Sequence, residues 1–473
     1  MYINGTWLTA QNKFTVTNPA TSEVIGEAEN GDRADAKAAI DAANNAFISW
    51  KKTTAYERSA ILERAYSLMI DRREVLAELM TKEQGKPFKA AFNEVGYAAD
   101  FFKWFAEEAK RNYGEIIPSA RSDQRFLVRH EPVGVVAAIT PWNYPISMIT
   151  RKVAPALAAG CTVVLKPAEA TPLCARAVFE ILDDAGCPDG VVNMVTSLKP
   201  APIGEEFCVN PLVKKLTFTG STQVGKQLAT LAASSMKRVS LELGGHAPFI
   251  VFDDADASHA AKGASLVKFL NAGQACISPN RIFVQRSIHD EFVGTLTKRI
   301  AKLRVGSGMN PKNNIGPLVN ERAIKKVQNQ VDDAINKGAD LILGGQTMTN
   351  GDLKQGHFYA PTLLNNISTD MLIYTEETFG PVAAVIPFDE EDQVIDMAND
   401  TRYGLAAYVY TRDISRAMKI YEALNFGIIG VNDINPTSAA APFGGMNQSG
   451  LGREGAREGM REYQETKLGG FSL

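Results

Sequence analysis

Residues 133–166 read VGVVAAITPWNYPISMITRKVAPALAAGCTVVLK, and this stretch decides the fold class. The apolar runs 133–139 and 161–166 predict buried strands, and residues 146–158 between them predict a helix that ends at Gly160. Buried strands that alternate with helices belong to parallel sheets covered by helices on both faces. The stretch therefore predicts a doubly wound α/β sheet.

The same alternation extends along most of the chain in two series. In the first series we expect helices at 32–49, 55–82, 92–113 and 172–185, strands at 191–195, 215–219 and 239–243, and a helix from Thr222. The second series begins after Gly245, with strands at 249–252 and 281–285, a helix to about Asn271 and a long helix from Ser287. The sequence thus predicts two doubly wound α/β domains that join near Gly244.

Composition and charge limit the function classes. The chain has 473 residues, 45% hydrophobic and 22% charged, which are the values of a folded globular protein rather than a disordered one. A formal net charge of -3 offers no basic footprint for nucleic acid or for an anionic membrane surface. The uncharged stretch 132–150 contains two internal prolines, so we expect no membrane span.

Cysteine and histidine spacing excludes two further classes. The five cysteines form no CxxC pair and the five histidines form no HxxxH or HxH pair. We therefore expect no disulfide framework and no metal site. A reducing compartment, and hence a cytoplasmic enzyme, fits this cysteine usage.

The strongest local candidate for chemistry is Cys276 in NAGQACISPNR, residues 271–281. It stands in a loop between a predicted helix and a predicted strand, where a thiol is accessible rather than packed. Most cysteines are instead small buried hydrophobes, and Cys161, Cys174 and Cys187 have that character. From the residues alone, Cys276 fits a nucleophile and a core cysteine equally well.

Two other polar residues occupy unusual positions. Glu242 in LELGG is a single carboxylate at the end of an apolar strand, where burial would raise its pKa and suit it to accept a proton near neutral pH. Asn143 lies in TPWNYP, residues 140–145, where two prolines could hold its amide toward developing negative charge. Plainer interpretations also exist: a carboxylate bonded to the glycine amides that follow it, and a rigid turn beside a core tryptophan.

Two glycine motifs carry less weight. Residues 220–226 read GSTQVGK between a strand and a helix and resemble a Walker A motif, but Gln227 replaces the hydroxyl residue that binds Mg²⁺. The turn still offers a helix N-terminus to a phosphate. Residues 450–455 match GxGxxG by letters but follow no apolar strand, so we interpret them as a surface turn. A P-loop ATPase stays an alternative, which ATP against NAD binding would test.

A thiol, a solitary carboxylate, an amide donor and a phosphate-binding turn together indicate thiohemiacetal chemistry on a nucleotide-binding scaffold. With these residues in place, the chain resembles the aldehyde dehydrogenase superfamily over essentially its whole length. The motifs that carry the resemblance stand in the family's order: PWNYP, VVLKPAEATP, FTGSTQVG, LELGG, GQACISPNR, EETFGPV, YGLAAYVY and PFGGMNQSGLGRE.

The resemblance implies a role for each catalytic candidate. Cys276 would attack the aldehyde carbon, and Asn143 with the Cys276 backbone N–H would stabilise the oxyanion. Hydride transfer to the nicotinamide would leave a thioester, and Glu242 would activate the water that hydrolyses it. Lys152 matches the family's buried lysine, which assists proton relay and cofactor orientation.

The resemblance also implies a cofactor site. Lys166 and Glu169 match the residues that bind the adenosine ribose hydroxyls. A carboxylate beside the ribose accepts a hydrogen bond from a 2′-OH but repels a 2′-phosphate, so we expect NAD to be preferred over NADP. The other cofactor candidates are Thr140, Trp142, Gly220, Ser221, Leu243, Gly244, Glu377 and Phe379.

For the substrate, the sequence looks most like the succinate-semialdehyde dehydrogenases. In that subfamily an arginine and a serine, here Arg151 and Ser438, hold the substrate carboxylate, although Arg151 could equally be a salt bridge at a helix start. Leu270 replaces a second arginine usual six positions before the nucleophile, and Ser278 replaces a cysteine usual two positions after it. We expect succinate semialdehyde as substrate, with an uncharged aldehyde or a longer semialdehyde as alternatives.

The family architecture implies domain boundaries. We expect an NAD-binding domain at 1–113 and 132–244, a catalytic domain at 245–445, and an oligomerisation arm at 114–131 and 462–473, which ends in a predicted strand. A homodimer or homotetramer follows from such an arm. A CoA-acylating reaction and a non-catalytic binding protein on the same scaffold are the remaining alternatives.

Overall fold

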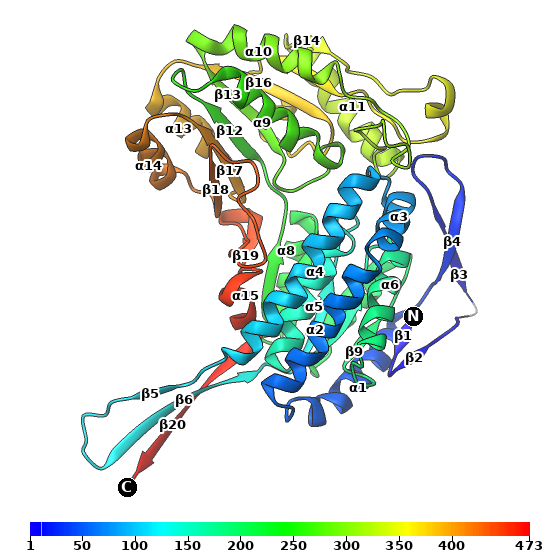
Figure 1. Cartoon of the computed structure of the whole chain (residues 1–473), viewed down its shortest axis with the longest axis vertical. Helices are drawn as coiled ribbons and strands as arrows, with labels where there is room; N and C mark the ends of the chain where they lie inside the picture. The colour runs from blue at the N-terminus through cyan, green and yellow to red at the C-terminus, as the bar shows by residue number, and fades with distance from the viewer. Residues whose placement is uncertain (11) are drawn as a thin grey trace.

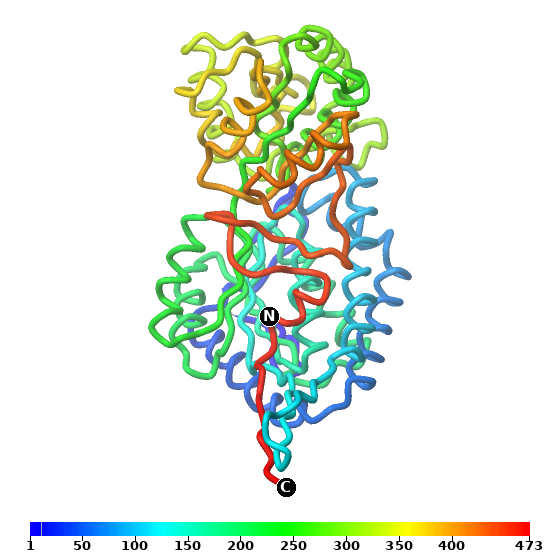
Figure 2. Tube along the Cα trace, turned by 90° about the vertical axis from the view of Figure 1, so that its left-hand side faces the viewer, coloured from blue at the N-terminus to red at the C-terminus, as the bar shows by residue number. Residues whose placement is uncertain are grey.

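The computed structural model describes residues 1–10 and 12–473. Figure 1 shows two α/β lobes joined end to end, with a thin sheet that projects from the lower lobe and carries the C-terminus at its tip. In Figure 2 the upper lobe runs from green to orange and so comes from the second half of the chain. Two sheet-based α/β lobes confirm the expected fold class. Within the described ranges no helix is both long and apolar enough to cross a membrane.

The sheet of the lower lobe has eight strands in the order β19-β11-β10-β7-β8-β9-β1-β2. The core from β11 to β9 is parallel, and β1 and β19 pair antiparallel with its two edges. The chain adds β8 and β9 on one side of β7 and β10 and β11 on the other, so the topological switch point lies between β7 and β10. The strands are β1 (Tyr2–Ile3), β2 (Thr6–Trp7), β7 (Val135–Ile139), β8 (Thr162–Lys166), β9 (Val192–Met194), β10 (Val213–Thr219), β11 (Arg238–Glu242) and β19 (Gly450–Leu451).

Helices cover both faces of this sheet. In β7, Val136 and Ala138 pack with α2, α4, α5 and α6, whereas Val135 and Ala137 pack with α1, α7 and α8. Burial on both faces is the reason that the strands are continuous apolar runs. The expected helix 55–82 is interrupted by one residue between α2 and α3. The helices are α1 (Arg33–Trp50), α2 (Ala55–Asp71), α3 (Arg73–Gln84), α4 (Phe88–Lys110), α5 (Ser147–Ala159), α6 (Pro172–Asp184), α7 (Pro200–Val209) and α8 (Thr222–Ala233).

The upper lobe contains a sheet of seven strands in the order β14-β15-β16-β13-β12-β17-β18. All neighbours are parallel except β14 and β15. Residues 243–246 lead directly from β11 into β12, and residues 432–449 lead back from β18 to β19 in the lower sheet. The strands are β12 (Ala247–Val251), β13 (Pro279–Gln285), β14 (Asp340–Leu343), β15 (Thr362–Asn365), β16 (Val382–Phe388), β17 (Ala406–Tyr410) and β18 (Ile428–Val431). The helices are α9 (Ala257–Phe269), η1 (Leu270–Gly273), α10 (Arg286–Ile300), α11 (Glu321–Asn336), η2 (Gly351–Gln355), α12 (Leu372–Thr375), α13 (Glu391–Asn399) and α14 (Ile414–Ala423).

The projecting sheet is built from two distant parts of the chain (Figure 1). β20 (Gln464–Ser472) pairs along its whole length with β6 (Gln124–Pro132), and β5 (Glu115–Ile117) completes the sheet. The terminal strand predicted from the sequence is therefore confirmed, and it lies at an edge of the sheet. The smaller elements are β3 (Lys13–Thr17), β4 (Val24–Glu29), η3 (Asn447–Ser449) and α15 (Ala456–Arg461).

Residues 450–455 are not the surface turn that we expected. Gly450 lies opposite Glu242 in the pairing of β19 with β11, and both Gly450 and Glu454 are buried. Gly450 adopts φ +141°, and a side chain there would overlap the Leu241 carbonyl oxygen. The segment therefore closes the edge of the lower sheet beside Glu242, a position that depends on pairing with a strand some 200 residues earlier.

Candidate active site

The carboxyl edge of the lower sheet gathers the predicted cofactor residues. Thr140 follows β7, Lys166 ends β8, Gly220 follows β10 and Glu242 ends β11. Backbone hydrogen bonds join neighbouring loops, because Thr140 N donates to Lys166 O (3.2 Å) and Gly220 N donates to Glu242 O (3.0 Å). These residues flank the switch point between β7 and β10, where sheets of this kind bind their ligands.

The residues at this edge fit a dinucleotide. Ser221 caps α8, whose N-terminus therefore lies at the edge with its positive dipole end outward. Within α8, a side chain at Gly225 would overlap Leu243, so the glycine lets the helix start close to the strand ends. The buried Thr140 hydroxyl has no hydrogen-bond partner among the residues that the structure describes, which leaves it free for a ligand.

Two sets of contacts argue against the P-loop alternative. Lys226 donates to Gln448 Oε1 (2.9 Å) at the surface. Asp254 follows the apolar strand β12, the position in which a P-loop ATPase has its Mg²⁺-binding acid, and it accepts from the backbone of Arg412 (2.8 Å) and Asp413 (3.0 Å) in the upper lobe. The lysine and the carboxylate that would serve ATP are thus engaged separately in the two lobes.

A segment of the upper lobe approaches the same edge. Glu377 Oε1 accepts a hydrogen bond from Gly245 N (3.0 Å), and burial raises the pKa of this carboxyl. The rings of Trp142 and Phe379 meet edge to face with centroids 5.7 Å apart. Phe379 holds a left-handed φ of +55°, a conformation that non-glycine residues rarely adopt. Glu377 and Phe379, two predicted cofactor residues of the upper lobe, therefore contact Gly245 and Trp142, respectively.

The loop that carries Cys276 bends sharply before the cysteine. Asn271, Ala272 and Gly273 have φ of +51°, +55° and +73° in succession. A side chain at Gly273 would overlap the carbonyl oxygen of Gly380, so this bend packs directly against the segment that follows Phe379. Cys276 is partly exposed, whereas the other four cysteines are buried.

The LELGG segment passes directly over the cysteine. A side chain at Gly245 would overlap the backbone carbonyl oxygen of Cys276, so only glycine permits this approach. Glu242 ends the strand three positions earlier. The end of β11 and the Cys276 loop are thereby held against each other, although the sequence separates them by more than 30 residues.

Asn143 also lies against the Cys276 loop. Its side chain is buried, and Nδ2 donates to the carbonyl oxygen of Gln274 (3.1 Å), two positions before the cysteine. Its Oδ1 atom has no partner in the described part of the chain. The amide donor, the thiol loop and the end of β11 therefore converge, as the motifs predicted.

The electrostatics suit a thiol and a base that are both neutral at rest. Glu242 is 4% exposed, and neither of its carboxylate oxygens has a partner among the described residues. Burial, and then the neighbouring Glu454, raise its pKa well above the usual value, while Arg151 and Lys152 oppose the shift. Burial and the charge of Glu242 raise the pKa of Cys276 to about 12. The thiol is therefore protonated near neutral pH and needs a base to react.

Glu454 ends the PFGGMNQSGLGRE motif, where the sequence indicated no role for it, yet it organises the charges of the site. Its Oε2 lies 3.0 Å from Arg151 Nε, and its Oε1 accepts from Lys152 Nζ (2.5 Å). All three side chains are at most 5% exposed. Arg151 is thus a salt bridge, and its Nη2 still has no partner among described residues. The motif contains Glu454, but nothing in it indicated that Arg151 and Lys152 are its partners.

A cavity of about 560 Å³ opens beside Cys276, and two of the three predicted substrate residues line it. Arg151, Leu270 and Cys276 all line it, and Thr437 and Asn435 reach it from the segment before β19. Ser438 is exposed and lies outside this lining. Apolar lining residues include Tyr97, Met148, Leu266, Ile277, Ile434 and Phe443.

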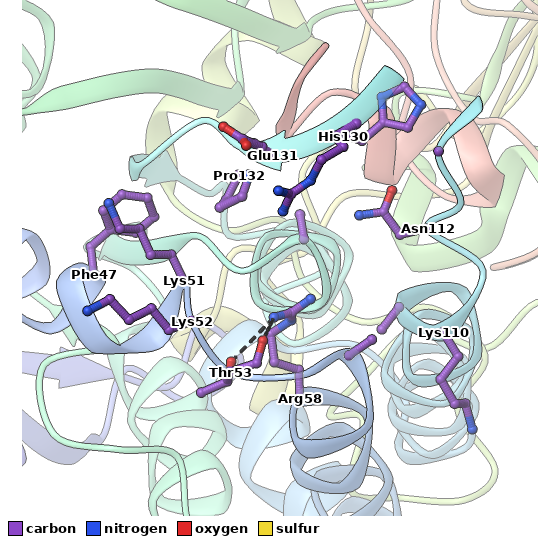
Figure 3. A pocket seen from close by; sticks show the side chains of 15 residues that line it. Phe47, Lys51, Lys52, Thr53, Arg58, Lys110, Asn112, His130, Glu131 and Pro132 are labelled. Atoms are coloured by element: carbon purple, nitrogen blue, oxygen red, sulfur yellow. Dashed lines mark hydrogen bonds between the residues drawn. The ribbon is translucent and has the colours of Figure 1, made fainter. Parts of the chain in front are cut away.

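A second cavity, of about 600 Å³, lies at the base of the projecting sheet (Figure 3). Lys51, Lys52 and Arg58 give it a basic wall. The Arg58 guanidinium donates to the carbonyl oxygens of Thr53 (2.6 Å) and Ala158 (3.0 Å), so it joins the start of α2 to the end of α5. Its described lining residues include no cysteine. The cavity beside Cys276 is therefore the candidate active site.

Fold and site together define a dinucleotide-dependent enzyme with a cysteine at its centre. The model of the aldehyde dehydrogenase family matches residues 7–468. The NADP(+) succinate-semialdehyde dehydrogenase GabD of Escherichia coli is 49% identical over 467 residues, which cover 98% of this chain and 96% of the relative. The glutarate-semialdehyde dehydrogenase of Pseudomonas putida is 49% identical over 468 residues, with coverage of 98% and 96%.

A solved structure gives the same result. The crystal structure of succinate-semialdehyde dehydrogenase from Burkholderia pseudomallei matches with a TM-score of 0.98 at 46% identity, covering 100% of this chain and 97% of that one. The chain belongs to the aldehyde dehydrogenase family. It is an oxidoreductase that oxidises aldehydes with a nicotinamide cofactor.

The expected preference for NAD over NADP is wrong. The relative from E. coli is named for NADP(+). The expectation treated the Glu169 carboxylate as an isolated charge, but its Oε2 lies 3.1 Å from Lys166 Nζ. The Lys166–Glu169 pair has no net charge. A lone carboxylate at this edge would repel a 2′-phosphate, but the Lys166 ammonium group beside it offsets that repulsion.

The electrostatics of Glu242 predict how acid formation depends on pH. A base with a raised pKa accepts protons only above that pKa, so the rate should rise with pH through a value well above the usual carboxyl range. Glu454→Gln removes the negative charge and leaves Arg151 and Lys152 unopposed, which lowers the pKa of Glu242. The rising limb of kcat against pH should move to lower pH by about one unit.

The opposite charge change provides the check. Lys152→Met removes a positive charge that lowers the pKa of Glu242, so the rising limb should move to higher pH. The exposed Glu458 on α15 offers a matched control, and Glu458→Gln should leave the profile in place. Movement of both buried-site variants in the same direction would contradict this assignment of the limb.

Proposed function

We propose that the enzyme oxidises succinate semialdehyde to succinate with NADP(+). The observation that carries the substrate proposal is Arg151, which is 2% exposed, lines the cavity beside Cys276 and keeps an Nη2 group with no partner among described residues. A buried guanidinium donor is suited to a carboxylate. Two of the relatives above are named for succinate semialdehyde and one for glutarate semialdehyde.

In the proposed first step, Cys276 attacks the aldehyde carbon. Glu242, in the ionised form that it reaches above its raised pKa, takes the thiol proton, because its charge acts on that thiol more strongly than any other. The new S–C bond pushes the carbonyl electron pair onto oxygen, and Asn143 Nδ2 with the Cys276 N–H stabilises that oxyanion. When bound, the nicotinamide accepts the hydride that leaves this carbon, which converts the adduct to a thioester.

In the proposed second step, Glu242 acts again. Once it has released the first proton, it takes a proton from a water molecule that attacks the thioester carbon. The C–S bond breaks, the acid is released, and Cys276 leaves as a thiolate that is reprotonated. Lys152 assists as the buried cation that faces Glu454, beside Glu242. Transfer to CoA would need no such base, so Glu242 supports hydrolysis.

We propose the following residues for the cofactor, from the adenosine ribose to the nicotinamide: Lys166, Glu169, Thr140, Trp142, Gly220, Ser221, Leu243, Gly244, Glu377 and Phe379. Their support is the convergence of these segments at one sheet edge and at the α8 N-terminus. For the substrate we propose Arg151 and Leu270 from the cavity wall. Ser438 has less support, because its neighbour Thr437 is the residue that lines the cavity.

We also propose an oligomer and its domain division. The boundaries are a cofactor domain at 1–113 and 132–244, a catalytic domain at 245–445 and an arm at 114–131 and 462–473. A homodimer or homotetramer is supported by β20, an edge strand whose second side can pair with a neighbouring chain. A cytoplasmic location is supported by chemistry, because the Cys276 thiol must stay reduced to act as a nucleophile.

The first experiment tests the thioester mechanism. Cys276→Ala should lower acid formation by about 10³-fold or more, because no other group replaces the nucleophile. Glu242→Gln should slow both the deprotonation of the thiol and the hydrolysis of the thioester. Intact-protein mass spectrometry after incubation at alkaline pH, where solvent hydroxide removes the thiol proton, should therefore find one acyl group on Cys276. Cys187→Ala, a buried cysteine outside the site, should keep normal turnover. Faster turnover on addition of CoA would contradict hydrolysis.

The second experiment tests the substrate carboxylate. Arg151→Met should lower kcat/KM for succinate semialdehyde by about 10–100-fold and for butanal much less, because a charged hydrogen bond is worth about 1.5–3 kcal/mol. Leu270→Arg adds a second cation to the cavity wall and should raise kcat/KM for succinate semialdehyde over butanal. A wild-type preference for butanal would overturn the substrate proposal, and a preference for glutarate semialdehyde would replace it by the longer homologue.

The third experiment tests the cofactor. We expect kcat/KM to be higher with NADP(+) than with NAD(+), because the Lys166 ammonium can pair with a 2′-phosphate. Lys166→Met should lower the NADP(+) value by about 10–100-fold and the NAD(+) value less. Lys214→Met, an exposed lysine on β10, should leave the ratio unchanged. An equal loss with both cofactors would show that Lys166 does not contact the phosphate.

A further inference from the structure

A second buried ion pair lies in the wall of the active-site cavity and has no part in the chemistry above. Lys86 precedes α4, and Glu94 lies in its second turn. Their side chains are 1% and 2% exposed, and the Lys86 ammonium donates directly to the Glu94 carboxylate. Both line the cavity beside Cys276. Burying two charges is costly, so their other contacts indicate what the pair does.

Lys86 holds the backbone of the Asn143 loop. Its Nζ donates to the Asn143 carbonyl oxygen (2.7 Å) and lies 4.0 Å from the centroid of the Tyr144 ring. Asn271 Nδ2, from the bend before Cys276, donates to the same carbonyl oxygen (2.9 Å). The residue whose amide serves the oxyanion is therefore fixed from both sides, by the ion pair and by the thiol loop.

Glu94 holds the other end of the same loop. Its Oε1 accepts from the backbone N–H groups of Ile146 and Ser147 (3.2 Å each) and from the Ser147 hydroxyl (3.4 Å). These groups form the start of α5, where a negative charge is favourable. α5 carries Arg151 and Lys152 one turn later. The pair thus holds both ends of residues 143–147, which connect Asn143 to the start of α5.

We propose that Lys86 and Glu94 are positioning residues that set the Asn143 amide for the attack of Cys276. The inference rests on the proposed function, in which Asn143 donates to the oxyanion. Reacting groups must be held within a fraction of an ångström, and a shift of about 1 Å costs about 10²-fold in rate. Loss of the pair should therefore slow the first chemical step and leave cofactor binding as it is, because the side-chain hydrogen bonds of the pair in the described part of the chain go to Asn143, Ile146 and Ser147 and not to a proposed cofactor residue.

The test uses variants that remove both charges. Lys86→Met/Glu94→Gln keeps the shape of the pair and leaves no unpaired buried charge, so the protein should fold. Single-turnover formation of reduced cofactor should slow by about 10²-fold, with KM for NADP(+) unchanged. Glu83→Gln is the matched control, since Glu83 is a buried acid that binds the N–H groups of Leu173 and Cys174 at the start of α6. It should keep the wild-type single-turnover rate.

Asn143→Ala separates positioning from general stability. If Lys86 and Glu94 act through Asn143, adding Asn143→Ala to the double variant should slow the reaction no further than Asn143→Ala alone. Independent effects that multiply, or a double variant as fast as wild type, would overturn the proposal. If the double variant does not fold, Glu94→Gln alone enters the same cycle with the same two outcomes. A wild-type rate for Asn143→Ala would instead reject the oxyanion role in the proposed function.

Discussion

The active site depends on one close contact, that of Gly245 with the backbone carbonyl of Cys276. Any side chain at this position would overlap the carbonyl oxygen. The contact places the short connection from β11 to β12 on top of the thiol loop, so Glu242 at the end of β11 and Cys276 before β13 belong to different lobes but to one site. The N–H of Gly245 also binds Glu377 and so attaches a third segment. A backbone junction therefore brings the end of β11, which carries Glu242, against the Cys276 loop.

Around this junction most buried charged groups are paired, but Glu242 is not. Arg151 and Lys152 share Glu454, and Lys86 pairs with Glu94, so these five charged groups near the cavity have partners. Glu242 alone is left without one among the described residues, and burial keeps it protonated to unusually high pH. Paired charges hold α5 and the Asn143 loop in place, whereas the unpaired carboxyl is free to exchange protons. Glu94 and Glu454 therefore hold structure in place, whereas Glu242 is the acid that can exchange protons.

How far the sequence predicts this molecule depends on the range of the interactions. β8 spans Thr162–Lys166, against 161–166 predicted, because a strand buried on both faces is a continuous apolar run with glycine beside it. Cys276, Glu242 and Asn143 converge as their motifs indicated. Glu454 was not predictable, since its partner Lys152 lies 302 positions away and nothing local distinguishes it from a turn residue. The NAD preference failed for a similar reason: the charge of Glu169 has meaning only together with Lys166.

The raised pKa of Cys276 has a consequence beyond the proposed reaction. Peroxides and alkylating agents attack the thiolate rather than the thiol, and a pKa raised to about 12 leaves almost none of it between turnovers. Ser278 stands two positions away and has no sulfur with which a damaged cysteine could form a disulfide. Position 278 therefore cannot form a disulfide with an oxidised Cys276, and the protection left is the low fraction of thiolate. The same raised pKa that makes the proposed first step depend on a base also leaves little thiolate for oxidants to attack.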